Sequence, residues 1–398
     1  MQKQNRKIIG FNLIEVIIII VVSALISAIA TGIIVTGNQR TSSGTTYAEL
    51  LQDENIKSFL DVYSDVVNGY YEDVDKNKAI ESAISGMMDY LGDKYTTYLN
   101  DSETSDLTNS LQGKYTGIGI SISSDYIIQE VFDNTPASEA GLKKDDKIIS
   151  VNGVLTEGLE ITQVTDNIKN SNSDVELVIL RNNQEINIKL QVKEINKPAI
   201  VYSIQEKDNK KIGYLFISTF SSTLGEQVQN ALEKLESQNI DRLIIDLRGN
   251  GGGYLTAAEE TASLFLEKDK VIYSLETKDE IKTYNDQTNE KRDYKIVVLV
   301  NKGTASAAEI LTSALKDSYG ATIVGDTTYG KGKVQQTKTL SDGTMVKYTT
   351  AKWLRPNGEC VDQVGITPDI EVSLSVNEDG EVESDNQLEK AIEVILQD

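Results

Sequence analysis

The stretch Ile296-Val-Val-Leu-Val-Asn-Lys-Gly-Thr-Ala-Ser306-Ala-Ala-Glu-Ile310 decides the fold of the second half of the chain. Its apolar run, residues 296–300, predicts a strand, and residues 306–316 predict the helix that follows. Polar and glycine residues between the two mark a turn. A strand, a turn and a helix in this order make one βα unit.

Similar units surround this stretch. Residues 212–216 and 243–246 predict strands, and the second runs into the glycine-rich loop 247–253 and then a helix through Ala257, Thr261 and Leu264. Residues 321–324 predict a further strand. Repeated βα units imply a largely parallel sheet with functional loops at the strand ends. The fold class we expect for this half is therefore α/β.

Ser306 lies at a predicted junction of strand and helix. The amide of Ala307 points outward there with the positive end of the helix dipole, which suits a developing oxyanion. Gly252 is the candidate second donor, because glycines let backbone amides approach an oxyanion closely. Two alternatives stay open: Ser306 as an ordinary helix N-cap, and the glycines as a turn that only relieves crowding.

Histidine is absent from all 398 residues. A Ser-His-Asp triad and a histidine-ligated zinc site are therefore excluded. A desolvated lysine can act as the base instead, and Lys331 in Tyr329-Gly-Lys-Gly-Lys-Val-Gln335 is the candidate. Such chemistry needs no metal or other cofactor.

A phosphate-binding P-loop is a further alternative, because Gly325-Asp-Thr-Thr-Tyr-Gly-Lys331 follows a predicted strand. A P-loop needs Ser or Thr after the lysine and then a helix. Here Gly332 follows, and residues 334–337 look extended. The pattern disfavours a nucleotide-binding site.

Composition limits the class of protein. A formal charge of −22, from 39 basic and 61 acidic residues, disfavours nucleic acid as a partner. The single cysteine, Cys360, cannot form an intramolecular disulfide. The length predicts two or three domains.

The N-terminus has the pattern of a membrane anchor. Lys3, Arg6 and Lys7 precede the apolar run 16–35, which is about long enough to cross ~30 Å of hydrocarbon. The charge bias places the N-terminus inside and the bulk of the chain outside the membrane. A cleaved secretory signal is the alternative. Gly10-Phe-Asn-Leu-Ile-Glu15 also resembles a type IV prepilin processing site, although a glutamate that reaches the headgroups explains it equally simply.

Past a flexible tether at residues 41–46, two amphipathic helices are expected, with apolar faces that pack as a pair. Their apolar residues are Ile56, Phe59, Leu60, Tyr63, Val66 and Val67 in the first, and Ile80, Ala83, Ile84, Met87, Met88 and Leu91 in the second.

Short β-like runs follow, at residues 117–122, 126–131, 147–151 and 175–180. Residues 135–153, from Thr135-Pro-Ala-Ser-Glu-Ala-Gly to Ser-Val-Asn-Gly153, resemble the PDZ signature, and Tyr115-Thr-Gly-Ile-Gly-Ile120 resembles the carboxylate-binding loop of that family. A PDZ domain adds an extended peptide to a sheet edge. The resemblance implies that loop amides of Gly117, Ile118, Gly119 and Ile120 bind the free C-terminus of a protein.

Residues from about 75 to 374 resemble the C-terminal processing peptidases, the tail-specific serine proteases of the S41 type. The motifs that carry the resemblance are Gly92-Asp-Lys-Tyr-Thr-Thr-Tyr-Leu99, which looks like the entry to the PDZ domain, Asp246-Leu-Arg-Gly-Asn-Gly-Gly-Gly253, Gly303-Thr-Ala-Ser-Ala-Ala-Glu309, Arg355-Pro-Asn-Gly358 and Gly365-Ile-Thr-Pro-Asp369.

The resemblance implies a crotonase/ClpP-like core of βα repeats. It also implies that Ser306 is the nucleophile, Lys331 the base and Gln335 the residue that orients the lysine, with Gly252 and Ala307 as the oxyanion hole. Two positions differ or stay open: Lys169-Asn170 stands where members commonly have Arg-Gly, and Glu309 is either catalytic or a residue that complements the helix dipole.

The resulting expectation is a multidomain α/β and α+β protein. Its parts are a cytoplasmic N-terminus (1–12), a transmembrane anchor (13–36), a linker (37–52), a helical region (53–112), a PDZ domain (113–197), an S41-type catalytic core (198–374) and a C-terminal helical segment (375–398).

We expect a serine endopeptidase of the bacterial cytoplasmic membrane with its catalytic part outside, acting on proteins with free C-termini. The alternative is an inactive peptide-binding scaffold. The pattern at residues 388–396 predicts a helix, for which homodimerisation and packing within the chain both stay open.

Overall fold

The computed structural model describes residues 46–132, 134–171, 174–196, 198–376 and 382–397. The chain divides into two compact units between Met87 and Met88. The predicted anchor, residues 13–36, and the segment before it lie outside the described residues. Among the helices that are described, none is long and apolar enough to cross a membrane.

The two predicted N-terminal helices form as α3 (Glu54–Gly69) and α4 (Lys76–Tyr90), but their apolar faces are not buried. A further short helix, α2 (Tyr47–Leu50), lies in the segment 37–52 that we expected to be a linker. No residue of α3 or α4 is buried, and Phe59 is 48% exposed. The expectation of a packed core at these helices is therefore wrong. Helical periodicity identifies the apolar face of a helix but not the surface that covers it.

The small β-domain contains the predicted strands at residues 147–151 and 175–180. The elements are β2 (Lys114–Gly117), β3 (Ile120–Ile122), β4 (Ile128–Val131), α6 (Pro136–Glu139), β5 (Lys147–Val151), β6 (Val154–Leu155), α7 (Ile161–Lys169), β7 (Asp174–Arg181), β8 (Gln184–Gln191) and β9 (Lys193–Asn196). The run 117–122 was predicted as one strand, but it is split between β2 and β3. Gly119 interrupts it with φ +92°, a conformation that no regular strand contains.

The predicted parallel sheet is confirmed. It has the order β10-β11-β12-β15-β16-β19, in which all neighbours are parallel except β10 and β11. The strands are β10 (Ile200–Lys207), β11 (Lys210–Ile217), β12 (Arg242–Asp246), β15 (Lys295–Val300), β16 (Thr322–Gly325) and β19 (Ile370–Glu371). Both functional loops, after β12 and after β15, leave neighbouring strands at the same sheet edge.

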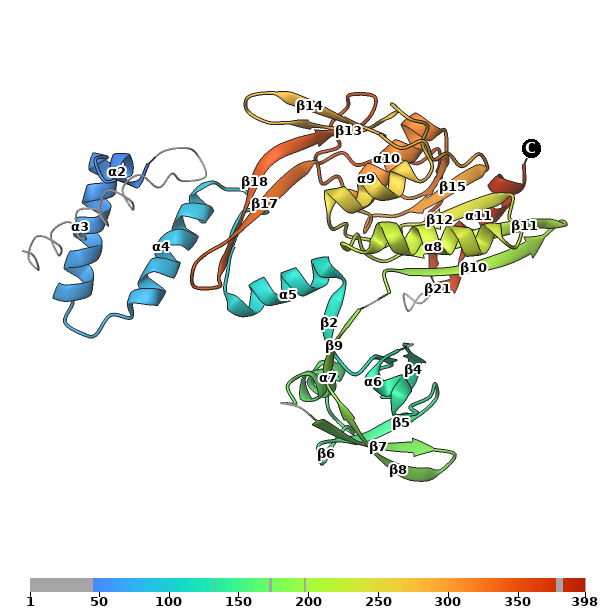
Figure 1. Cartoon of the computed structure of the whole chain (residues 1–398), viewed down its shortest axis with the longest axis horizontal. Coiled ribbons are helices and arrows are strands. Elements are labelled where there is room, and N and C mark those ends of the chain that lie inside the picture. The colour runs from blue at the N-terminus through green and yellow to red at the C-terminus, as the bar shows by residue number, and fades with distance from the viewer. Residues whose placement is uncertain (1–45, 133, 172–173, 197, 377–381, 398) are drawn as a thin grey trace, which may run out of the picture. The chain divides into compact units, whose positions relative to one another are not determined.

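Helices cover both faces of this sheet (Figure 1). Leu243 and Ile245 face the helices α8 (Leu224–Glu236), α9 (Leu255–Ser263) and α10 (Ala307–Ala314), which continues into a π-helical turn, η1 (Leu315–Tyr319). Ile244 between them faces α11 (Asn386–Leu396) on the other side. This alternation is the two-residue period of a strand buried on both faces. The C-terminal helix thus packs within its own chain.

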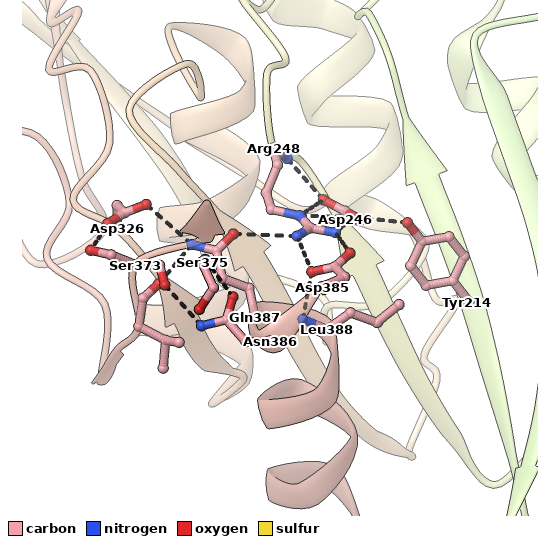
Figure 2. A network of polar contacts seen from close by, with 11 residues as sticks. Tyr214, Asp246, Arg248, Asp326, Ser373, Ser375, Asp385, Asn386, Gln387 and Leu388 are labelled. Atoms are coloured by element: carbon pink, nitrogen blue, oxygen red, sulfur yellow. Dashed lines mark hydrogen bonds and ion pairs between the residues drawn. The ribbon is translucent and has the colours of Figure 1, made fainter. Parts of the chain in front are cut away.

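A polar network attaches the start of α11 to the end of β12 (Figure 2). Arg248 donates to both carboxylate oxygens of Asp246 and of Asp385, at 2.6 to 3.1 Å. Tyr214 also donates to Asp246, at 2.8 Å. The glycine loop therefore leaves its strand at a point where one guanidinium ties the sheet to the C-terminal helix.

A second sheet has the order β1-β18-β13-β14, with β17 also paired to β18. Its strands are β1 (Thr97–Leu99), β13 (Val271–Glu276), β14 (Ile281–Asn285), β17 (Lys333–Thr339) and β18 (Met345–Leu354). After β1 comes α5 (Asp101–Gln112), and β20 (Ser375–Val376) pairs with β21 (Val382–Ser384) near the C-terminus. The segment 92–99, predicted as the entry to the PDZ domain, thus pairs through β1 with β18, the strand that follows and pairs with β17. Tyr95 of this segment lies beside Lys331.

Candidate active site

Ser306 lies between β15 and the first turn of α10, as the sequence predicts. Its backbone has φ +57° and ψ −122°, a region that a residue with a side chain seldom adopts. Such strain persists only when surrounding contacts hold it, and it is common at active sites. The half-buried side chain stands at the junction where a sharp turn between strand and helix exposes a nucleophile.

Glu309 supplies those contacts. Its carboxyl group is fully buried and accepts four hydrogen bonds. One oxygen accepts from the amides of Ser306 (2.8 Å) and Lys331 (2.9 Å). The other accepts from the Thr328 hydroxyl (2.6 Å) and the Gly330 amide (2.8 Å). The Glu309 side chain thus ties the backbone of the Ser306 turn to the backbone of the Lys331 loop. A glutamate that only complemented the helix dipole would not make this link.

Lys331 has a half-buried side chain whose amine lies 4.9 Å from the centre of the Tyr95 ring. Trp353 fixes the backbone by donating its indole N–H to the Lys331 carbonyl, at 2.8 Å. Burial away from water, and then the nearby ammonium of Lys347, lower the pKa of Lys331 from its ordinary value. The amine is therefore more easily neutral than that of an exposed lysine.

Among the residues that the structure describes, the side chains of Ser306 and Lys331 are not joined by a hydrogen bond. Nor does Gln335 bond to Lys331: its side-chain N–H donates to the Thr349 hydroxyl, at 3.2 Å. The structure brings the backbones of Ser306 and Lys331 together through Glu309. The roles of Ser306, Lys331 and Gln335 in catalysis stay predictions.

The two predicted oxyanion donors are neighbours. A side chain at Gly252 would lie 2.8 Å from the carbonyl oxygen of Ala305 and 3.0 Å from the amide nitrogen of Ala307, so only glycine fits there. The Ala307 amide has no acceptor among the described groups. The Gly252 amide does have one, because it donates to the side-chain oxygen of Asn250 at 2.8 Å. One predicted donor is thus free and the other is engaged.

The predicted peptide-binding loop lines a separate cavity of about 450 Å³. Gly117 to Ile120 form one wall, and a side chain at Gly119 would overlap Thr135. Tyr115 also lines the cavity. Across the cavity, the Lys169 ammonium pairs with Asp106 at 3.2 Å. Lys169, which stands where family members commonly have arginine, therefore forms an ion pair with Asp106.

Sequence reasoning missed the residues of segment 92–99 that lie beside Lys331. Tyr95 faces the Lys331 amine, and Asp93 accepts hydrogen bonds from Lys333 (3.0 Å), Thr349 (2.5 Å) and Thr96 (2.8 Å). The motif was visible, but its place beside Lys331 depends on the pairing of β1 with β18.

Comparisons with known families and proteins agree on one assignment. The profile of peptidase family S41 matches residues 211–372, that of the PDZ domain matches residues 106–180, and that of the activating protease CtpB N-terminal domain matches residues 29–104.

The carboxy-terminal processing protease CtpB of Bacillus subtilis is 34% identical over 368 residues, which cover 88% of this chain and 77% of that protein. A CtpA-like serine protease of Staphylococcus haemolyticus is 32% identical over 379 residues, covering 94% of this chain and 75% of that protein.

Among solved structures, a photosystem II D1 C-terminal processing protease has a TM-score of 0.50 and 26% identity, over 83% of this chain and 91% of that one.

Proposed function

Because this chain belongs to peptidase family S41 and is a C-terminal processing serine protease with a PDZ domain, we propose that Ser306 and Lys331 form its catalytic dyad. The observation that carries the proposal is the buried Glu309 carboxyl group, which holds the strained turn of Ser306 and the loop of Lys331 together. A carboxyl group shared by two loops in this way fixes the spacing of their backbones.

In the proposed reaction, neutral Lys331 accepts the hydroxyl proton of Ser306 while the serine oxygen attacks the substrate carbonyl carbon. The oxyanion forms beside the free amide of Ala307. Lys331 then protonates the leaving amine, and an acyl-enzyme remains on Ser306. Water attacks the acyl group with Lys331 again as the base, which releases the carboxylic acid and restores the serine.

Two adjustments complete the site in this proposal. The Lys331 amine turns from the Tyr95 ring toward Ser306, since catalytic hydrogen bonds are often long before substrate binds. The Gly252 amide exchanges the side chain of Asn250 for the oxyanion. Gln335 is proposed to orient the Lys331 amine once it has turned.

We further propose that the PDZ domain recruits substrates by their free C-termini. The cavity lined by Gly117 to Ile120 supports this, because the PDZ family binds a terminal carboxylate at this loop beside a strand edge.

The test of the dyad is cleavage of an unstructured protein by the chain from residue 41 onward. Ser306→Ala and Lys331→Ala should each abolish turnover while the circular dichroism spectrum stays unchanged. Lys331→Arg should also be inactive, because a guanidinium does not lose its proton in proteins. Lys302→Ala, a change at an exposed lysine in the Ser306 loop, is the matched control and should keep full activity. Turnover by purified Ser306→Ala would refute the dyad, and no cleavage by the unmodified chain would favour an inactive scaffold.

A membrane location is also proposed, from the pattern of residues 1–36 alone. The full chain should stay with membranes after alkaline carbonate washing, and added protease should reach its catalytic part from outside intact cells. Release by carbonate, or protection of the catalytic part in intact cells, would contradict an anchor with the catalytic part outside.

A further inference from the structure

Three side chains beside Lys331 form a directional chain of hydrogen bonds. Gln335 donates its side-chain N–H to the Thr349 hydroxyl oxygen at 3.2 Å, and Thr349 lies 2.5 Å from a carboxylate oxygen of Asp93. Asp93 comes from the segment before β1, Thr349 from β18 and Gln335 from β17. The three residues thus link three parts of the second sheet.

The direction of this chain follows from the number of hydrogens available. Asp93 is an acceptor only: burial alone would raise the pKa of its carboxyl group, but hydrogen bonds from Thr349 and Lys333 outweigh burial and lower the pKa to about 2. Thr349 has one hydroxyl hydrogen, and the carboxylate takes it. The hydroxyl oxygen can then only accept, so the group of Gln335 that faces it must be the NH2 and not the carbonyl.

Because the NH2 group of the Gln335 amide bonds to Thr349, the carbonyl oxygen of this amide points elsewhere. No donor within the described part of the chain bonds to it. An oxygen can accept a hydrogen bond from the Lys331 ammonium, whereas an NH2 in its place would oppose the same charge. The orientation of this amide therefore decides whether Gln335 attracts or repels the protonated base.

We propose that Asp93 and Thr349 are positioning residues for catalysis, which set the Gln335 amide so that its oxygen is presented to Lys331. The inference rests on the proposed dyad, and it deepens the role that the family resemblance implies for Gln335. Asp93 touches no substrate here and acts through Thr349.

The same short segment supports Lys331 in a second way. Tyr95, two residues after Asp93, places its ring against the Lys331 amine, and Thr96 accepts the backbone N–H of Thr349 at 3.1 Å. The segment is held by the pairing of Thr97 with Lys347. Residues 93–97 thus have two roles. Tyr95 packs against the Lys331 amine, and Asp93 and Thr96 hold Thr349, which in turn holds the Gln335 amide.

The test compares Thr349→Val, which removes the hydroxyl at nearly constant volume, with Thr349→Ser, which keeps it. Thr349→Val should lower kcat about 10- to 100-fold at an unchanged KM, because a misplaced base slows only the chemical step. Thr349→Ser should stay within about threefold of the unmodified enzyme. Thr350→Val is the matched control, since the Thr350 hydroxyl bonds to no described group, and it should change nothing.

Asp93→Asn gives a second measurement, the pH dependence of kcat/KM, which the loss of a purely structural residue would leave unchanged. The charged and titratable groups that influence Lys331 are Lys347, Tyr329, Glu309 and Asp93. Asp93 favours the ammonium form, so its neutralisation should lower the pKa of Lys331 further. The acidic limb of kcat/KM should therefore move to lower pH, while kcat falls as the Gln335 amide loses its fixed orientation.

The outcomes separate this inference from the dyad on which it rests. If Ser306→Ala is inactive but Thr349→Val keeps the kcat and pH profile of the unmodified enzyme, the dyad stands and the positioning role is wrong. Equal loss in Thr349→Val and Thr349→Ser would also overturn it, because packing and not the hydroxyl would then matter. If Ser306→Ala retains turnover, both proposals fail together.

Discussion

At the scale of single residues, Glu309 has the largest share in shaping the candidate site. Its buried carboxyl group accepts four hydrogen bonds, two at each oxygen, so every acceptor position of the carboxyl group is occupied. Its presence explains how Ser306 keeps a backbone conformation with φ +57°. The strain at Ser306 is offset by bonds that Glu309 makes three residues further along the chain.

Glu309→Gln tests this role. The amide NH2 must face either the pair Ser306 and Lys331, where it meets two backbone N–H donors, or the pair Thr328 and Gly330, where it meets the Gly330 N–H donor. We expect a loss of roughly 2–4 kcal/mol in unfolding free energy, from buried groups left without partners, and at least a tenfold fall in kcat. Urea unfolding and steady-state kinetics measure the two effects. Glu389→Gln, at an exposed glutamate of α11, is the control, and equal behaviour of the two variants would contradict the assignment.

Lys331 predicts how activity depends on pH. Only its neutral form accepts the serine proton, and its pKa is lowered from the ordinary value by burial. Activity should therefore rise with pH, and the acidic limb of kcat/KM should report deprotonation of this lysine. No histidine exists to produce such a limb. Gln335→Ala should lower kcat strongly, and a variant with an unchanged rate and pH profile would show that Gln335 has no part in catalysis. A limb near pH 4–5 in the unmodified enzyme would indicate a carboxyl group as the base instead.

At the scale of elements, the turn between β2 and β3 shapes the cavity that we propose binds peptides. Gly119 with φ +92° interrupts the run, and its carbonyl accepts the amide N–H of Phe132 at 2.9 Å. The turn is therefore attached to the small domain, and Gly117 to Ile120 line the cavity. This arrangement suits a carboxylate, which needs several N–H donors from one short stretch.

Peptide binding is best measured on the inactive Ser306→Ala chain, so that no ligand is consumed. A peptide with a free C-terminus should bind, and the same peptide with an amidated C-terminus should lose at least tenfold in affinity, because the loop amides pair with charge. Gly119→Ala should weaken binding of the free peptide, since a side chain there meets Thr135 and the backbone is strained. Equal affinity for the free and amidated peptides would exclude carboxylate recognition.

At the scale of the whole molecule, the C-terminal helix completes the catalytic core. α11 covers the sheet face formed by Ile244 and Val297, among others, and Arg248 ties its first turn to the end of β12. The strand that leads into the glycine loop is thus held from both faces. Loss of the helix would expose a continuous apolar sheet surface.

Ile395→Ala tests this cover. Ile395 is fully buried against the sheet, so the truncation should cost about 2–5 kcal/mol of unfolding free energy by leaving a cavity. Glu393→Ala on the same helix removes a surface ion pair with Lys390 and a long hydrogen bond from Gln397, and it should cost less than about 1 kcal/mol. Denaturant unfolding of the two variants gives the comparison. Equal stability of both would mean that α11 does not contribute to the core.

Local sequence determined the βα units, the position of Ser306 before α10 and the extended strand after Lys331, because strand and helix periodicity and turn residues act over a few positions. Only the tertiary structure decided what surrounds Lys331. Asp93 and Thr349 are 256 residues apart, and Glu309 meets Lys331 from 22 residues away. Hydrogen bonds between such groups depend on which strands pair and in which register, and no local pattern records that. For the same reason, the apolar faces of α3 and α4 were predictable from their spacing, but their exposure was not.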